Sequence, residues 1–375
     1  MSYKEIIQKL EIAALHPSKT VADTIKNTGK PMVGCFPIHT PEEIIYAAGA
    51  IPIGMWGGNT ELQLADKYLQ SFCCSIMRSN MEYGMKGTYS MLKGIILPTF
   101  CDTLKCVCEN WKVAVPQIPI IPIVYPQNRT LDCGFEYLVN EFNRVKGEVE
   151  KLLEIQLSDD KLEKAFDLYE DYRDTMRMFT EVAADHPEII GARTRHLIIK
   201  AGQFLDKASY KEDMKAIIEG LKQEPIKKFK GIKVIPTGLI AEPVEILEIF
   251  EENHIAFVGD DLAQESRQWR TPSRKEGSVF EKMAYRMADQ RGDTFLYEEQ
   301  KTRGQMLIDM KKEKKADAIV VFMMKFCDPE EFDYPIYKAE IEAAGIPMLY
   351  LEIDQQITSF EQIRTRVQSF TEMLI

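Results

Sequence analysis

Three landmarks occur twice along this 375-residue chain, in the same order and more than two hundred residues apart. They are a Pro-x-Glu-Ile-Ile/Leu segment at 41–45 and 243–247, a Phe-Cys-Asp tripeptide at 100–102 and 326–328, and an apolar run at 118–123 and 346–351. One repeated tripeptide is weak evidence, but three landmarks in register indicate two related halves. We therefore expect a fold with an internal duplication.

Each half alternates apolar, β-branched runs with helical patterns, which is typical of a parallel sheet covered by helices on both faces. The sequence predicts an α/β protein with two Rossmann-like or flavodoxin-like domains joined by a helical connector. The predicted boundaries are 1–135 for the first domain, 136–225 for the connector and 226–375 for the second domain. The expected strands are 31–36, 51–56, 94–100 and 118–124, then 231–236, 255–258, 318–324 and 346–352.

Helices are predicted in the segments between these strands. One helix is predicted from the N-terminus to about Lys26, and a second is predicted to open with Thr40 as its N-cap and to end at Gly49. In the connector, Ser158 is expected to cap a helix whose apolar residues recur at helical spacing. Those residues are Leu162, Ala165, Phe166, Tyr169, Tyr172, Met176 and Phe179.

Charge and hydropathy exclude several classes of protein. The formal net charge is −11, so binding to nucleic acid is not expected, because that needs a concentrated basic face. The basic run from Arg267 to Arg303 is interleaved with acidic residues and is interpreted as a solvated helical face. The N-terminus lacks the apolar core of a signal peptide and no run of 18 apolar residues exists, so we expect a cytoplasmic protein without a membrane span.

Eight cysteines in a reducing compartment must be core residues, metal ligands or redox groups, since disulfides are rare there. Cys101 and Cys327 end equivalent strands, and ligands of open α/β sheets bind at the carboxyl ends of strands. With one of the adjacent Cys73 and Cys74 they supply three thiolates, which suit zinc or an iron–sulfur cluster. In a helix, Cys106 and Cys108 would point in nearly opposite directions, so at most one of them could join Cys101 at a common site. Both are expected in the core.

The usual signatures of other enzymes are missing from the sequence. It contains no CxxC, GxGxxG, GxxxxGK[ST], HExxH or GxSxG pattern. Five histidines are scattered, and only His39 is placed near the predicted crevice, where a loop or core position is the simplest interpretation. A binding protein whose thiols are structural or hold zinc therefore stays as an alternative to an enzyme.

The sequence resembles the 2-hydroxyacyl-CoA dehydratase family, which also includes benzoyl-CoA reductase subunits. The resemblance is carried by residues 40–52, by Cys74-Ser75, and by the segments 97–102 and 325–329 around the two Phe-Cys-Asp tripeptides. It implies a [4Fe–4S] cluster at the domain junction, held by Cys74, Cys101 and Cys327. Two points stay open. Cys73 is an alternative to Cys74, and the fourth ligand is either Cys133 or a small molecule.

The resemblance also implies a reaction and partners. The length is that of the smaller, β-type subunit, which would pair with a homologous α-type subunit that binds most of the acyl-CoA substrate. An ATP-hydrolysing iron–sulfur activator would donate one electron, which the cluster of this subunit relays or stores. The implied reaction is loss of water from an (R)-2-hydroxyacyl-CoA, through a ketyl radical, to an (E)-2-enoyl-CoA. A reductase subunit acting on an aromatic acyl-CoA is the alternative within the family.

Overall fold

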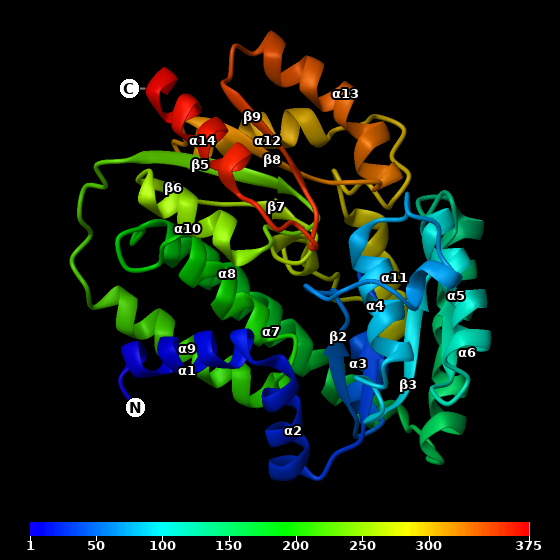
Figure 1. Ribbon diagram of the computed structural model, residues 1–375. Coiled ribbons are helices and arrows are strands. Elements are labelled where there is room, and N and C mark those ends of the chain that lie inside the picture. The colour runs from blue at the N-terminus through cyan, green and yellow to red at the C-terminus, as the bar shows by residue number, and fades with distance from the viewer. Residues whose placement is uncertain (375) are drawn as a thin grey trace.

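The computed structural model describes residues 1–374, which form two parallel sheets covered by helices (Figure 1). The first sheet contains β1 (Met32–Cys35), β2 (Ile51–Gly54), β3 (Leu92–Pro98) and β4 (Ile120–Ile123). Its strand order is β2-β1-β3-β4, and every pair in it is parallel. This is the order of the first four strands in flavodoxin-like sheets.

The second sheet has the same order as the first. Its strands are β5 (Ile232–Gly238), β6 (Ile255–Phe257), β7 (Asp261–Leu262), β8 (Ala318–Met324) and β9 (Met348–Ile353). The order is β6-β5-β8-β9, with the short β7 pairing with β5, and all pairs are parallel. The predicted α/β class with two parallel sheets is confirmed, and the shared strand order accounts for the landmarks that recur in the sequence.

The N-terminal segment forms two helices, so the expectation of a single helix to Lys26 was wrong. α1 (Tyr3–Leu15) begins at Ser2, whose hydroxyl accepts from the backbone N–H of Glu5. α2 (Pro17–Thr28) begins directly after His16. Proline lacks the N–H that a continuous helix needs and disfavours helical backbone before it, so Pro17 starts a new helix.

The helix after β1 also begins later than expected. α3 spans Glu42–Ala47, and its N-cap is Pro41, not Thr40. The hydroxyl of Thr40 donates instead to the carbonyl of Phe36, at 2.8 Å, and so is used inside the preceding loop. This loop, residues 36–40, leaves the carboxyl end of β1 and borders the sites described below.

Four helices link the two sheets: α6 (Asp132–Leu153), α7 (Asp159–Ala184), α8 (Ala192–Ala201) and α9 (Lys207–Lys222). Ser158 is the N-cap of α7, as predicted, and its hydroxyl accepts from the N–H of Lys161. The predicted apolar residues of α7 are all buried, which confirms its core-facing side. α6 packs on β3 and β4, whereas α1 packs on α8 and α9.

The remaining helices cover the sheets and join the two halves. They are α4 (Ser75–Met85), α5 (Asp102–Ala114), α10 (Val244–Glu252), α11 (Val279–Asp289), α12 (Arg303–Glu313), α13 (Asp328–Ala343) and α14 (Glu361–Leu374). α11 belongs to the second half in sequence, yet it packs against α6 beside the first sheet (Figure 1). Among residues 1–374, no helix has the length and apolar character needed to cross a bilayer.

The basic run between Arg267 and Arg303 is not a uniformly solvated face, so that interpretation was wrong. Arg267 and Arg303 are buried, and each forms an ion pair of 3.0 Å with Asp261. Both also bind Glu330, at 3.0 and 2.8 Å. Buried charges need such partners, and here carboxylates from β7 and α13 supply them. Arg274 in the same run does lie at the surface, paired with Asp289.

Candidate functional site

One cavity between the two sheets is lined by three cysteines: Cys74, Cys101 and Cys327. We call it the cysteine cavity; its volume is about 30 Å³. Cys101 follows β3, Cys327 follows the equivalent strand β8, and Cys74 lies immediately before α4. The structure therefore brings together the three cysteines that were predicted as one site, two from the first half of the chain and one from the second.

All three cysteines occupy the same position in their local structure, the N-cap of a helix. Cys74 caps α4, Cys101 caps α5 and Cys327 caps α13. The backbone N–H of Leu104 donates to Cys101 Sγ at 3.4 Å. Helix N-termini present unpaired N–H groups and a positive dipole end, so three of them around one cavity favour negative charge on the sulfur atoms.

Burial works against that charge in the free thiols. It raises the pKa of Cys74 to about 12, although the backbone N–H of Met77 opposes the shift. Burial also raises the pKa of Cys101 and, further, that of Cys327. Because cysteines bind metal as thiolates, binding of metal by these three residues would release their protons.

The rest of the cysteine cavity is mainly apolar. Its walls include Pro37 and Ile38 from the loop after β1, Trp56 from the segment after β2, and Leu239 and Phe295 from the second half. Such a lining excludes water and lowers the local dielectric, which strengthens electrostatic effects inside the cavity.

The other cysteines lie elsewhere. Cys73 is buried in the core beside Cys74 but outside the cavity lining. Cys133 is exposed near the start of α6 and borders a shallow surface hollow with Tyr125 and Tyr137, so the structure does not bring it to the three predicted ligands. Cys108 is buried as expected, whereas Cys106 is exposed because its side of α5 faces solvent, so the core assignment of Cys106 was wrong.

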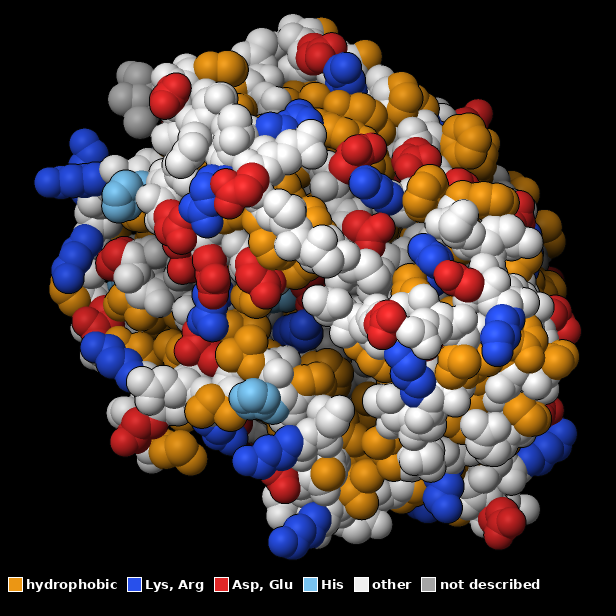
Figure 2. All heavy atoms as spheres, viewed as in Figure 1, with side chains coloured by type: hydrophobic (Ala, Val, Ile, Leu, Met, Phe, Trp, Pro, Cys, Tyr) orange, Lys and Arg blue, Asp and Glu red, His pale blue; other side chains and the backbone are white. Residues whose placement is uncertain are grey.

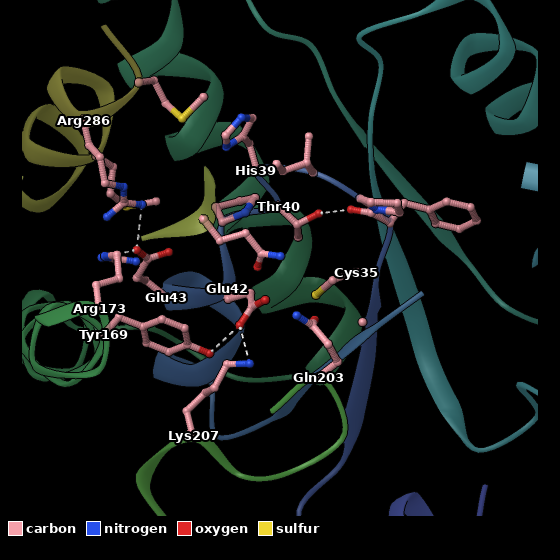
Figure 3. A pocket seen from close by; sticks show the side chains of 18 of the residues that line it. Cys35, His39, Thr40, Glu42, Glu43, Tyr169, Arg173, Gln203, Lys207 and Arg286 are labelled. Atoms are coloured by element: carbon pink, nitrogen blue, oxygen red, sulfur yellow. Dashed lines mark hydrogen bonds and ion pairs between the residues drawn. The ribbon is translucent and has the colours of Figure 1, made fainter. Parts of the chain in front are cut away.

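A second, polar cavity adjoins the first, and Pro37, Ile38 and Trp56 line both. Its volume is about 80 Å³. Figure 3 shows Glu42 at its centre, accepting from Tyr169 Oη at 2.9 Å, with Lys207 Nζ 3.6 Å from the same carboxylate. Lys207 is buried and also donates to the carbonyl of Gly202.

The neighbouring Glu43 is held by two guanidinium groups. Arg173 and Arg286 each bind Glu43 Oε1 at 2.8 Å, and Figure 3 shows them approaching it from two different helices. Burial raises the pKa of Glu43, but the two arginines lower it by more, so it falls to about 2. Sequence reasoning missed this cluster because its members come from α3, α7 and α11, and no local spacing connects them.

His39 lies in the loop near the crevice, as predicted, and its ring is fixed from two sides. Its Nε2 is 2.8 Å from Asp293 Oδ2, and Phe100 packs against the ring edge-on at 5.8 Å between centroids. Asp293 is buried; burial raises its pKa, but His39 and Arg267 lower it below its usual range. The carbonyl of His39 accepts from Tyr125. These contacts hold the loop that separates the two cavities.

The cysteine cavity does not have the form of a site for one metal ion. Within residues 1–374, no group of three or more His, Cys, Asp or Glu side chains is arranged closely enough to hold a single ion. The three thiols nevertheless interact electrostatically, because Cys101 and Cys73 raise the pKa of Cys74, and Cys74 raises that of Cys327.

Comparison with known proteins places the chain in a family. Residues 37–374 match the family described as 2-hydroxyglutaryl-CoA dehydratase, D-component. The (R)-phenyllactyl-CoA dehydratase beta subunit of Clostridium sporogenes is 40% identical over 99% of this chain and 97% of its own length. The lactoyl-CoA dehydratase subunit beta of Anaerotignum propionicum is 43% identical, over 98% of each chain.

A third relative, the (R)-2-hydroxyglutaryl-CoA dehydratase subunit beta of Acidaminococcus fermentans, is 33% identical over the full length of both chains. With its two parallel sheets and its junction of cysteines, the chain belongs to the 2-hydroxyacyl-CoA dehydratase family. Within that family it is of the beta-subunit type. It is therefore one subunit of a dehydratase, an enzyme of the hydro-lyase class.

Proposed function

We propose that this chain is the cluster-bearing β-type subunit of an (R)-2-hydroxyacyl-CoA dehydratase, with a [4Fe–4S] cluster held by Cys74, Cys101 and Cys327. The observation that carries the proposal is the convergence of three N-cap cysteines on one cavity between the two sheets. A reducing cytoplasm, where we place the protein, would keep these groups available as thiols.

The residues of the cavity fit such a cluster. Thiolates are its usual protein ligands, and each binds a different iron, so the sulfur atoms need not surround one point. Backbone N–H groups near the sulfur atoms and an apolar wall are the features by which proteins tune cluster potentials. When bound, the cluster would supply one-electron transfer at low potential.

The role of this chain's own residues follows from that arrangement. Cys74, Cys101 and Cys327 would hold the group across the junction, while Trp56 and Phe295 would keep water from it. The substrate would bind mainly on an α-type partner, and an ATP-hydrolysing iron–sulfur activator would deliver the electron that this subunit relays or stores. The partner's substrate would lose water through a ketyl radical and give an (E)-2-enoyl-CoA.

On the family resemblance alone, the proposed substrate is (R)-2-hydroxyisocaproyl-CoA. The relatives carry names with phenyllactyl, lactoyl and 2-hydroxyglutaryl groups, which differ in the acyl chain and share the 2-hydroxyacyl thioester. A panel of these four thioesters, assayed with the partner subunit, the activator and a reductant, tests the assignment. The branched aliphatic thioester is expected to react fastest. Reduction of an aromatic ring, without dehydration of any of the four, would contradict the proposal.

The ligand assignment is tested separately, by metal analysis of the heterodimer purified without oxygen. Cys74→Ser, Cys101→Ser and Cys327→Ser are each expected to lose iron, acid-labile sulfide and visible absorbance. Cys106→Ser and Cys133→Ser change exposed thiols and serve as matched controls that retain all three signals. Cys73→Ser, at the buried neighbour of Cys74, is also expected to retain them. Full iron in all three ligand variants, or iron loss only in Cys73→Ser or Cys133→Ser, would overturn the assignment.

A further inference from the structure

A larger cavity lies apart from the cysteines, where the N-terminal helices meet both halves of the chain. We call it the junction cavity; its volume is about 380 Å³. The turn between α1 and α2, the segment after β2, the end of α4, helix α8 and the start of α10 form its walls. Figure 2 shows a hollow near the middle of this face, bordered by hydrophobic side chains with a basic side chain set within it.

The size and lining are those of a site for a small molecule. Pockets that bind such ligands usually enclose roughly 300–1,000 Å³ and combine an apolar wall with few polar groups. The apolar wall here consists of Leu15, Val21, Met91, Leu92, Leu197 and Phe204. Trp56 lines both this cavity and the cysteine cavity, so the two lie on either side of this residue.

The polar feature that points to a ligand is Gln264. This residue lines the cavity and is 1% exposed, and among residues 1–374 no protein group hydrogen-bonds either its Oε1 or its Nε2. Its backbone is fixed, since the N–H donates to Leu239 at 2.9 Å and the carbonyl accepts from Gln268 at 2.8 Å. A buried carboxamide is costly to leave unpaired, and this one offers a donor and an acceptor side by side.

Among the described residues, the one cation of the wall, Lys200, is already paired with a carboxylate of the same wall. Lys200 Nζ is 2.6 Å from Glu242 Oε1, and Glu242 is further bound by His196 and Gln355. Burial raises the pKa of Glu242, but Lys200 and His196 lower it well below its usual range, so it stays ionised. An anionic head group entering the cavity would therefore lack a free cation in the part of the chain that the structure describes, whereas a neutral head can pair with Gln264.

We propose that the junction cavity binds a small neutral amphiphile, with a carboxamide-type head paired to Gln264 and an apolar tail among Val21, Leu92 and Phe204. The head presents one N–H donor to Gln264 Oε1 and one carbonyl acceptor to its Nε2, which satisfies both orphan atoms. The site is separate from the three cysteines and does not depend on what they bind.

The probe for the test is hexanamide, with hexanoate as its charged counterpart, titrated into the heterodimer by calorimetry. Trp56 fluorescence gives a second readout, because this indole lines the cavity. We expect saturable binding of hexanamide at one site on this chain, and at least about tenfold weaker binding of hexanoate. Val21→Phe places a larger side chain among the apolar residues of the cavity. It is expected to weaken the binding of hexanamide although Gln264 is unchanged.

Gln264→Leu is the decisive variant. It removes an unpaired buried polar group, so it is expected to fold at least as stably as the parent and to bind hexanamide at least about tenfold more weakly. Gln305→Leu changes an exposed glutamine on α12 and is the matched control that retains binding. Equal binding by parent and Gln264→Leu, no binding by the parent, or a crystal structure with only water on Gln264 in saturating hexanamide would overturn the proposal.

Discussion

The N–H of Gln355, in the segment after β9, donates to Ser75 Oγ at 3.1 Å, and so ties the second sheet to the first turn of α4. Ser75 also donates to the sulfur of Met324 at the end of β8, at 3.2 Å. Because Ser75 follows Cys74 directly, this contact fixes one cysteine of the cavity relative to the half of the chain that carries Cys327.

Replacement of Ser75 by alanine would leave the buried N–H of Gln355 without its acceptor. The expected cost is about 1–3 kcal/mol in the free energy of unfolding, the penalty for an unsatisfied buried donor. Urea titration monitored by circular dichroism measures this value. Ser71→Ala, at an exposed position just before Cys73, is the control and should change it little. Equal stability of both variants would show that Ser75 does not link the halves energetically.

Gly57 contacts Gln355 at the junction of the two halves, and Gly87 serves as its matched control. Both have positive φ, +74° and +79°, so alanine is strained at either position. A Cβ on Gly57 would clash with Gln355 Oε1, whereas one on Gly87 meets nothing within 4 Å. We expect Gly87→Ala to cost about 1 kcal/mol and Gly57→Ala clearly more, since each strained non-glycine residue costs roughly 1–3 kcal/mol before any clash. Differential scanning calorimetry would rank the two melting temperatures.

The pH dependence of stability should carry a contribution from Glu43. Its pKa in the folded protein is about 2, below the ordinary value of 4.5, because Arg286 and Arg173 outweigh the effect of burial. Its stabilisation is thus complete above about pH 4.5 and is lost as the pH falls towards 2. Glu43→Gln should be less stable at neutral pH and should lose less stability over this interval than the parent. Glu136→Gln, on the exposed face of α6, should follow the parent curve.

The buried arginines predict a contrast within one basic run. Arg303→Met would leave Asp261 and Glu330 with too little positive charge in a dry site, at an expected cost of about 3–5 kcal/mol. Arg274→Met breaks an exposed pair with Asp289 and should change the unfolding free energy little. Chemical denaturation of the two variants under identical conditions compares them. Similar small effects would restore the interpretation of the whole run as a solvated face.

The local pattern of the sequence was sufficient to place every strand among residues 1–374 except the two-residue β7, because buried parallel strands form short apolar runs. β8 illustrates this, since all seven of its residues are buried. The same reasoning located Cys101 and Cys327, as strand ends meet at one edge of a sheet. That these thiols bind iron stays a prediction, as does the choice of Cys74 over Cys73.

The parts that sequence reasoning missed depend on contacts between distant segments. Nothing local distinguishes Arg303, which is buried against Asp261, from Arg274, which is exposed. Glu42 and Lys207 meet in the polar cavity although a helical connector separates them in the sequence. A sequence gives the sign of the charge on each side chain, but only the tertiary structure decides which charges are buried and paired.

The origin of the cysteine cavity from both sheets has a consequence for synthesis of the protein. Cys74 and Cys101 leave the ribosome long before Cys327, whose strand lies near the end of the chain. Domains generally fold from the N-terminus as they emerge. Cys74 and Cys101 therefore stay exposed until the second half, which carries Cys327, has been synthesised and has folded. Oxygen reaching the cell during translation could then oxidise them before the cavity closes. Oxygen should therefore oxidise these thiols more readily in nascent chains than in the folded protein.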